Sequence, residues 1–403
     1  MRRLIPITLC IAWYAGLAPA QEQPAKSPLF DEIAEILNDL SSLTGWKAPK
    51  KVDSDTITKE GLKGFLESRM QEVVKPEEIR AEEIALKKLG LVPGTFDLKK
   101  MTVDLLTEQA AAFYDYQKKK LFILDTNASI TQKPVLVHEL AHALADIHVN
   151  LEKYILKGKS DDAALARQSV MEGQATWLMS EHLMARMGTS LRKAPEMAEA
   201  MNRMTGASGG MFPVFDSSPL YLRESLMFPY TKGFLFQQAV IVKLDKAGFM
   251  EVFKNPPQST QQIIHPEKYF AKVQPVKVPL PKTDIKGYDD LVEGTLGEFD
   301  HDILFRQYGS EGDAKWAQKW RGGQFRIYEQ KKDKSTVLLY ASEWEDAETA
   351  KEAFRLYQRV MKGKWKSMTI TSESVTQVEG KGDDGPFRLR LEGTRVSSTE
   401  GKL

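Results

Sequence analysis

Apolar residues recur every three or four positions along the first part of the chain. The clearest case lies between Leu29 and Leu43, where Ile33, Ile36 and Leu37 share one face of a predicted amphipathic helix. The same spacing predicts helices over 59–74, 76–88 and 98–110. The second of these has a proline in its first turn and ends near a glycine, the usual start and stop signals.

The pattern changes at residue 111 to short β-prone runs. Residues 112–116 and 120–124 predict a hairpin. Two helices follow, one over 135–148 and one that Ser160 and two aspartates cap and that runs to about residue 187. Residues 201–218 are rich in Met, Gly, Ser and Pro and predict a long loop, either a lid over a cleft or an ordinary surface connection. A helix over 230–247 comes next.

The C-terminal part has a different composition of elements. Closely spaced prolines at 275, 279 and 281 predict an extended linker. Strands are expected at 324–328, 336–342, 388–391 and 394–397, with an amphipathic helix over 345–361. The polar run Asp300-His301-Asp302 is interpreted as a solvated turn. The chain is therefore expected to be α+β, with a mostly helical region containing a small sheet and a smaller C-terminal α+β module over 281–403.

Composition and charge narrow the classes of partner that the chain is expected to bind. The 403 residues carry a net charge of +1 and 28% charged residues, which gives no reason to expect nucleic acid or an anionic membrane as the main partner. The length suggests two or three domains.

Residues 1–20 have the pattern of a cleaved signal peptide. Arg2 and Arg3 precede an uncharged, mostly apolar run, and Ala18-Pro19-Ala20 offers a cleavage site. An uncleaved anchor is the alternative, but no later stretch is long and apolar enough to span a membrane. The expected product is exported, periplasmic or secreted, with a polar segment and one helix over 21–54. Its only cysteine, Cys10, lies in the leader, so His, Asp or Glu must hold any metal in the mature chain.

One stretch carries recognisable chemistry. His138 and His142 lie one helical turn apart with Glu139 beside the first, so both imidazoles can reach one ion while the carboxylate leans over its open position. Zinc is the expected ion, and Glu139 the expected base for the water that zinc acidifies. The alternative is a pair of ordinary histidines on an amphipathic helix.

A catalytic zinc needs a third protein ligand. Glu172 is the best candidate, because it lies in the middle of a helix beside Gly173, whose cost in a helix suggests that another helix packs closely there. A solvated Glu172 is the alternative. Asp146, one turn beyond His142, either orients a ligating imidazole or is an exposed residue near a helix end.

These motifs together resemble the gluzincin group of zinc metallopeptidases, and more closely a bacterial family of exported metallopeptidases. The resemblance extends over about residues 55–400. It depends on His138-Glu139-Leu140-x-His142-Ala143-Leu144, on Glu172-Gly173-x-Ala175-Thr176, on Phe113-Tyr114-Asp115, on Pro229-Tyr230-x-x-Gly233, on Pro256-Pro257-x-Ser259-Thr260-x-Gln262 and on His265-Pro266-Glu267-Lys268-Tyr269. It implies a zincin-like catalytic domain over 55–280 in which His138, His142 and Glu172 hold Zn²⁺ and Glu139 is the general base. The thermolysin-like pattern has an aspartate where Thr176 stands, which leaves that supporting role open.

The resemblance also implies a His or Tyr that stabilises the oxyanion, and Tyr230 and His265 are the candidates. Each has a structural hydrogen-bonding role as its alternative. The expected reaction is hydrolysis of a peptide bond in a peptide or protein substrate, with an edge strand near Phe113 holding the extended substrate. Two alternatives remain: a zinc hydrolase of a non-peptide cell-wall amide, and a binding protein that keeps the zinc fold without turnover. The presence of Glu139 argues against the second.

Overall fold

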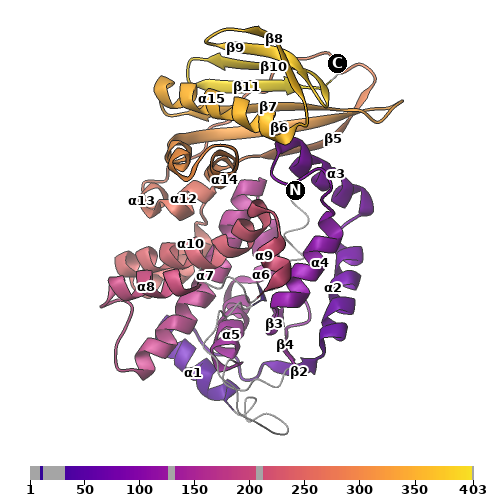
Figure 1. Ribbon diagram of the computed structural model, residues 1–403. Helices are drawn as coiled ribbons and strands as arrows, with labels where there is room; N and C mark the ends of the chain where they lie inside the picture. Colours follow the sequence, from indigo (N-terminus) through magenta and orange to yellow (C-terminus); the bar gives the residue numbers. More distant parts are fainter. Residues whose placement is uncertain (1–9, 12–31, 126–131, 206–211, 402–403) are drawn as a thin grey trace.

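The computed structural model describes residues 10–11, 32–125, 132–205 and 212–401. The cleavage site after Ala20 and most of the leader lie outside this range. The chain is a mixed α+β protein, as expected, with helices in the lower part of Figure 1 and an antiparallel sheet at the top. Within the described residues, no helix combines the length and the apolar character needed to cross a bilayer.

The N-terminal helices agree closely with the periodicity of the sequence. They are α1 Ile33–Thr44, α2 Lys59–Val73, α3 Pro76–Leu89 and α4 Leu98–Gln109. The predicted hairpin forms as β3 Ala112–Asp115 and β4 Lys120–Leu124, and β2 Asp53–Ile57, which the sequence did not predict, adds to β4 in parallel. On the other edge, β1 Cys10–Ile11 pairs antiparallel with β3.

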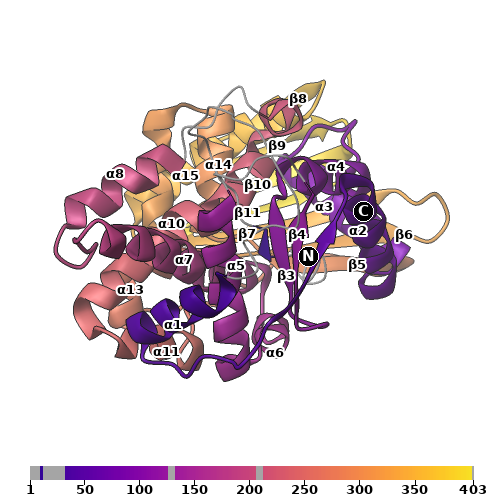
Figure 2. The same ribbon diagram turned by 90° about the horizontal axis from the view of Figure 1, so that it is seen from below.

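The central helices follow this sheet. They are α5 Gln132–Val149, α6 Leu151–Leu156, α7 Asp161–Arg186, α8 Pro195–Thr205, α9 Pro213–Ser217, α10 Leu220–Leu244, α11 Ala247–Lys254, α12 Thr260–Ile264 and α13 Pro266–Phe270. Figures 1 and 2 show α5 between the β3–β4 hairpin and α7. The side chains of α1, α5, α7, α10 and α11 form the largest apolar core.

Two expectations about the central region were wrong. The loop predicted over 201–218 is partly helical, because α8 extends to Thr205 and α9 begins at Pro213, while residues 206–211 are outside the described range. Helix α10 begins at Leu220, ten residues earlier than predicted, and contains Pro229. Proline usually ends a helix because it lacks an N–H donor, so a helix that continues through Pro229 is not expected from local rules.

The C-terminal module is a seven-stranded sheet in the order β5-β6-β7-β11-β10-β9-β8. Its elements are β5 Tyr288–Thr295, α14 Glu298–Tyr308, the 3₁₀ segment Glu311–Lys319, β6 Trp320–Gln330, β7 Thr336–Trp344, α15 Ala347–Lys364, β8 Met368–Glu373, β9 Gln377–Gly382, β10 Gly385–Glu392 and β11 Arg395–Glu400. The supposed turn at Asp300-His301-Asp302 is part of α14, and His301 is fully buried with its ring bonded to Gly297 and Tyr340. Helix α3 belongs to this second core, since Ala85, Leu86 and Leu89 pack with α15 and the sheet.

Two carboxylates in the first turn of α7 bond neighbouring elements, one in the C-terminal module and one in α12. Asp161 accepts a hydrogen bond from the Thr295 N–H (3.0 Å), and Asp162 accepts from both the N–H and the hydroxyl of Thr260 (3.1 and 2.5 Å). Burial raises the pKa of Asp162 to about 7, although the Thr260 hydrogen bonds oppose that shift. The folded chain therefore keeps a proton on Asp162 that the unfolded chain, with a pKa of about 4, releases.

This difference predicts that stability falls as pH rises from about 4 to about 7. Asp162→Asn, which is neutral throughout, is expected to flatten that dependence and to exceed wild type by at least about 1 kcal/mol at pH 8, since one pKa unit corresponds to about 1.4 kcal/mol. Urea unfolding at several pH values measures it. The control is Asp284→Asn, at an exposed carboxylate of the linker segment. Parallel pH profiles for wild type and Asp162→Asn would contradict the prediction.

Candidate metal centre

Helices α5 and α7 bring the three predicted ligands together. His138 and His142 project from one face of α5, and Glu172 meets them from the middle of α7. All three side chains are almost completely buried, with 1% of each residue exposed. Since a charged carboxylate and two imidazoles are costly to bury without partners, their convergence needs a physical reason.

The distances between the donor atoms fit a single ion. The Nε2 atoms of His138 and His142 lie 3.0 Å apart, and Oε2 of Glu172 lies 3.1 and 3.2 Å from them. Ligands about 2.1 Å from a tetrahedral zinc lie about 3.4 Å from each other, close to these separations. Hydrogen bonds alone do not account for the triangle, because three contacts need three protons and the two Nε2 atoms carry at most one each.

The charges of the trio also suit a cation. Burial by itself raises the pKa of Glu172, but the two imidazoles outweigh burial and hold it at about 2. Burial lowers the pKa of His138, although Glu172 opposes that shift. The carboxylate is therefore ionised and the imidazole of His138 neutral near pH 7, the protonation states that a metal ion requires of its ligands.

Glu139 directly follows the first ligand on α5 and is held by the edge of the small sheet. Its side chain is fully buried, and its Oε2 accepts a 2.7 Å hydrogen bond from the backbone N–H of Tyr114 in β3. The carboxylate therefore has a fixed position between the first ligand on α5 and the strand that runs beside that helix.

Of the two oxyanion candidates, one lies at the trio and the other does not. The ring of Tyr230, from α10, stacks beside His138 with centroids 6.0 Å apart and planes at 27°. His265 instead pairs with Glu298 (2.8 Å) at the junction with the C-terminal module. The adjoining α12 contacts Asp162, ten residues before Glu172 on α7, which corresponds to about 15 Å along the helix. The prediction for His265 is therefore corrected: its contacts are structural.

Asp146 does not orient an imidazole. Its Oδ1 accepts from the Leu151 N–H (2.9 Å), and its Oδ2 accepts from the Tyr114 hydroxyl (3.0 Å) and from Lys119 Nζ (2.5 Å). Asp146 is 4% exposed, so the alternative of an exposed residue is wrong as well. Both carboxylate oxygens are directed to the hairpin and to the start of α6.

Helix α7, which carries Glu172, crosses α10 at two glycines. A Cβ at Gly173 would lie 2.2 Å from the carbonyl carbon of Gly233, and one at Gly233 would lie 2.3 Å from the Ser169 carbonyl oxygen. The helices therefore approach backbone to backbone, as Gly173 in the sequence suggested. Tyr230, three residues before Gly233 on α10, has its ring beside His138 of the trio.

Gly173→Ala is expected to destabilise the protein by about 1–3 kcal/mol, because the backbone of α10 cannot move aside locally. The loss is expected in spite of the roughly 1 kcal/mol by which alanine favours a helix over glycine. Gly64→Ala in α2 is the matched control, since nothing lies within 4 Å of its added Cβ, and it should gain stability. Chemical denaturation measures both; equal gains for the two variants would show that α7 and α10 do not touch at Gly173.

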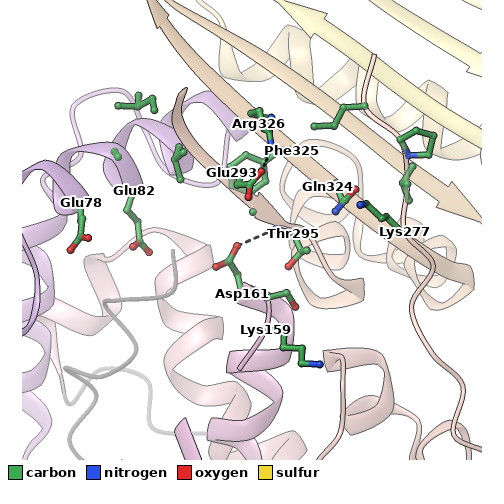
Figure 3. A pocket seen from close by; sticks show the side chains of 18 of the residues that line it. Glu78, Glu82, Lys159, Asp161, Lys277, Glu293, Thr295, Gln324, Phe325 and Arg326 are labelled. Carbon is green, nitrogen blue, oxygen red and sulfur yellow. Dashed lines mark hydrogen bonds and ion pairs between the residues drawn. The ribbon is translucent and has the colours of Figure 1, made fainter. Parts of the chain in front are cut away.

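A separate cavity of about 690 Å³ lies between α3, the start of α7 and strands β5 and β6. In Figure 3, Glu82 from α3 and Asp161 from α7 face each other across it, with Lys159 and Lys277 farther along its wall. Asp161 stands eleven residues before Glu172, about 16 Å along α7, so this cavity is not the metal centre. Burial raises the pKa of Glu82 to about 8.

Comparison with known proteins covers only the C-terminal module. A family model described as a domain of unknown function (DUF8575) matches residues 285–402, which contain the seven-stranded sheet, α14 and α15. No curated protein and no solved structure gives a significant match.

Sequence reasoning missed the part that Tyr114 and Lys119 play near the trio. Tyr114 belonged to a motif of the resemblance, and Lys119 lies in the turn of the predicted hairpin. Neither residue type marks a site by itself. Tyr114 and Lys119 reach Glu139 and Asp146 only because the hairpin packs against α5.

Proposed function

We propose that the chain is an exported zinc-dependent peptidase with a zincin-like catalytic region over 55–280. The observation that carries this proposal is the convergence of His138, His142 and Glu172 within 3.2 Å of one another, with a buried carboxylate, Glu139, next to the first ligand. A purely structural metal helix has no need of that carboxylate.

The three ligands would hold the ion and leave a fourth position open. Zinc held by these three residues would supply Lewis acidity, which polarises a carbonyl group and acidifies water. Glu139 takes a proton from the attacking water and returns it to the leaving amine. Tyr230, beside His138, is the candidate to donate a hydrogen bond to the oxyanion.

The edge of β3 supports an extended peptide as the substrate. Cys10 and Ile11 already pair antiparallel with Tyr114 and Phe113, so this edge can accept an added strand. Because the Tyr114 N–H also bonds Glu139, a strand added there would run directly beside the proposed base.

The test uses the purified mature protein loaded with zinc. Incubation with a mixed peptide library, followed by mass spectrometry, is expected to give defined cleavage products that disappear with a chelator and return with zinc. A peptidoglycan digest runs in parallel. Products from peptidoglycan alone would support the cell-wall amidase instead, and zinc binding without any hydrolysis would support a binding protein.

A further inference from the structure

Tyr114 contacts helix α5 at two separate points. Its backbone N–H donates to Glu139, and its side-chain hydroxyl donates to Asp146. Glu139 and Asp146 are seven residues apart, which is about two helical turns or 10.5 Å on one face of a helix. A single residue of β3, itself 3% exposed, therefore spans the face of α5 that carries the proposed base.

The far end of this contact is itself fixed. Asp146 has 1% of its side chain exposed and accepts a second hydrogen bond, at Oδ1, from the Leu151 N–H at the start of α6. Lys119 reaches the same carboxylate from the turn between β3 and β4, with about half of its side chain in solvent. Two residues of the hairpin, one in β3 and one in the turn, therefore bond Asp146.

We propose that Tyr114, Asp146 and Lys119 form a clamp that positions Glu139 for catalysis; this inference rests on the proposed peptidase function. The Asp146 end fixes the position of β3 along α5, and the Tyr114 N–H at the other end then fixes the Glu139 carboxylate. Tyr114 and Asp146 are positioning residues, because the hydroxyl bonds Asp146 and the Asp146 carboxylate bonds the hairpin and the start of α6. A shift of about 1 Å in a reacting group can lower a rate by roughly a hundredfold.

The decisive variant is Tyr114→Phe, which deletes the hydroxyl and leaves the backbone N–H in place. On an internally quenched peptide that wild type cleaves, kcat is expected to fall about tenfold with KM within about twofold of wild type, because the substrate still pairs with β3. Zinc content should not change, since no ligand is touched. Hydrogen exchange of the 112–116 segment should become faster, a readout that does not depend on activity.

Tyr154→Phe is the matched control. Tyr154 is also buried in the main core and also loses a hydroxyl bond, to the Val252 carbonyl, but it does not contact Glu139 or Asp146. It should leave kcat unchanged even if it lowers stability.

A double-mutant cycle with Asp146→Asn tests whether the clamp acts as a unit. The asparagine keeps the shape of Asp146 and removes the charge that holds Lys119, so each single variant should lower kcat and the double variant should be no worse than the poorer single one. Strictly additive effects, or wild-type kcat in a folded, zinc-loaded Tyr114→Phe, would overturn the clamp. Absence of hydrolysis in wild type would instead refute the peptidase, and the exchange rates of 112–116 would still decide whether Tyr114 holds the strand.

Discussion

Glu139→Gln is expected to lose activity by about 10³-fold, within the 10²- to 10⁴-fold that a general base contributes, while keeping its zinc. The amide has nearly the shape of the carboxylate and can still accept the Tyr114 N–H bond, so the site should stay folded. It cannot take a proton from water, and kcat rather than KM should carry the loss. Metal analysis and steady-state kinetics on the same preparation measure both quantities.

A matched control is Glu181→Gln, on α7. Glu181 is buried like Glu139, with 4% of the residue exposed. It bonds Ser190 and the Leu191 N–H near the C-terminal end of α7, nine residues after Glu172. It should keep its activity per folded molecule. A Glu139→Gln enzyme that still turns over at the wild-type rate would mean that another group serves as the base.

Replacing a metal-ligating residue is expected to reduce both metal binding and the stability that zinc adds. When free zinc is about 1,000 times its dissociation constant, it should stabilise wild type by about 4 kcal/mol, because it binds only the folded chain. In His142→Ala and Glu172→Gln the same zinc concentration should add less than about 1 kcal/mol. Calorimetry with and without zinc, beside metal analysis, gives the comparison.

Two controls separate ligand loss from general damage. His301→Gln removes a buried histidine that bonds Gly297 and Tyr340 in the C-terminal module and should leave the zinc-dependent stabilisation intact. Each variant is also compared with its own metal-free form, because Glu172→Gln loses the imidazole contacts that hold the pKa of this carboxylate at about 2 and should be less stable than wild type even without zinc. Wild-type zinc affinity in Glu172→Gln would eliminate Glu172 as the third ligand.

Local patterns in the sequence located several of the longer helices, whereas the short helices α6, α9 and α11 to α13 were not predicted. The 3.6-residue periodicity and capping residues located α1 to α5 and α7, and Ser160 caps α7 as predicted, with its hydroxyl accepting from the Ala163 N–H. The errors occur where a tertiary contact overrides a local rule. Helix α10 continues through Pro229, and Asp300 and His301 are buried because α14 packs against the sheet.

The metal trio and the residues around it show where sequence information ends. Two histidines one turn apart on a helix share a face, so the sequence by itself determined the pair His138 and His142 and the neighbouring Glu139. It also indicated Glu172, because a glycine in a helix interior has a cost that close packing explains.

Tertiary structure alone decided how far these side chains lie from one another and what surrounds them. The packing of α5 against α7 brings Glu172 to the imidazoles, and the backbone contact at Gly173 and Gly233 sets how closely α10 lies against α7. Because β3 packs against α5, Asp146 bonds Tyr114 instead of a ligand. Because α12 packs on the first turn of α7, His265 bonds Glu298 at a distance from the trio. The physical reason is range: periodicity and caps act over a few residues, whereas these contacts join segments tens of residues apart through the packing of the core.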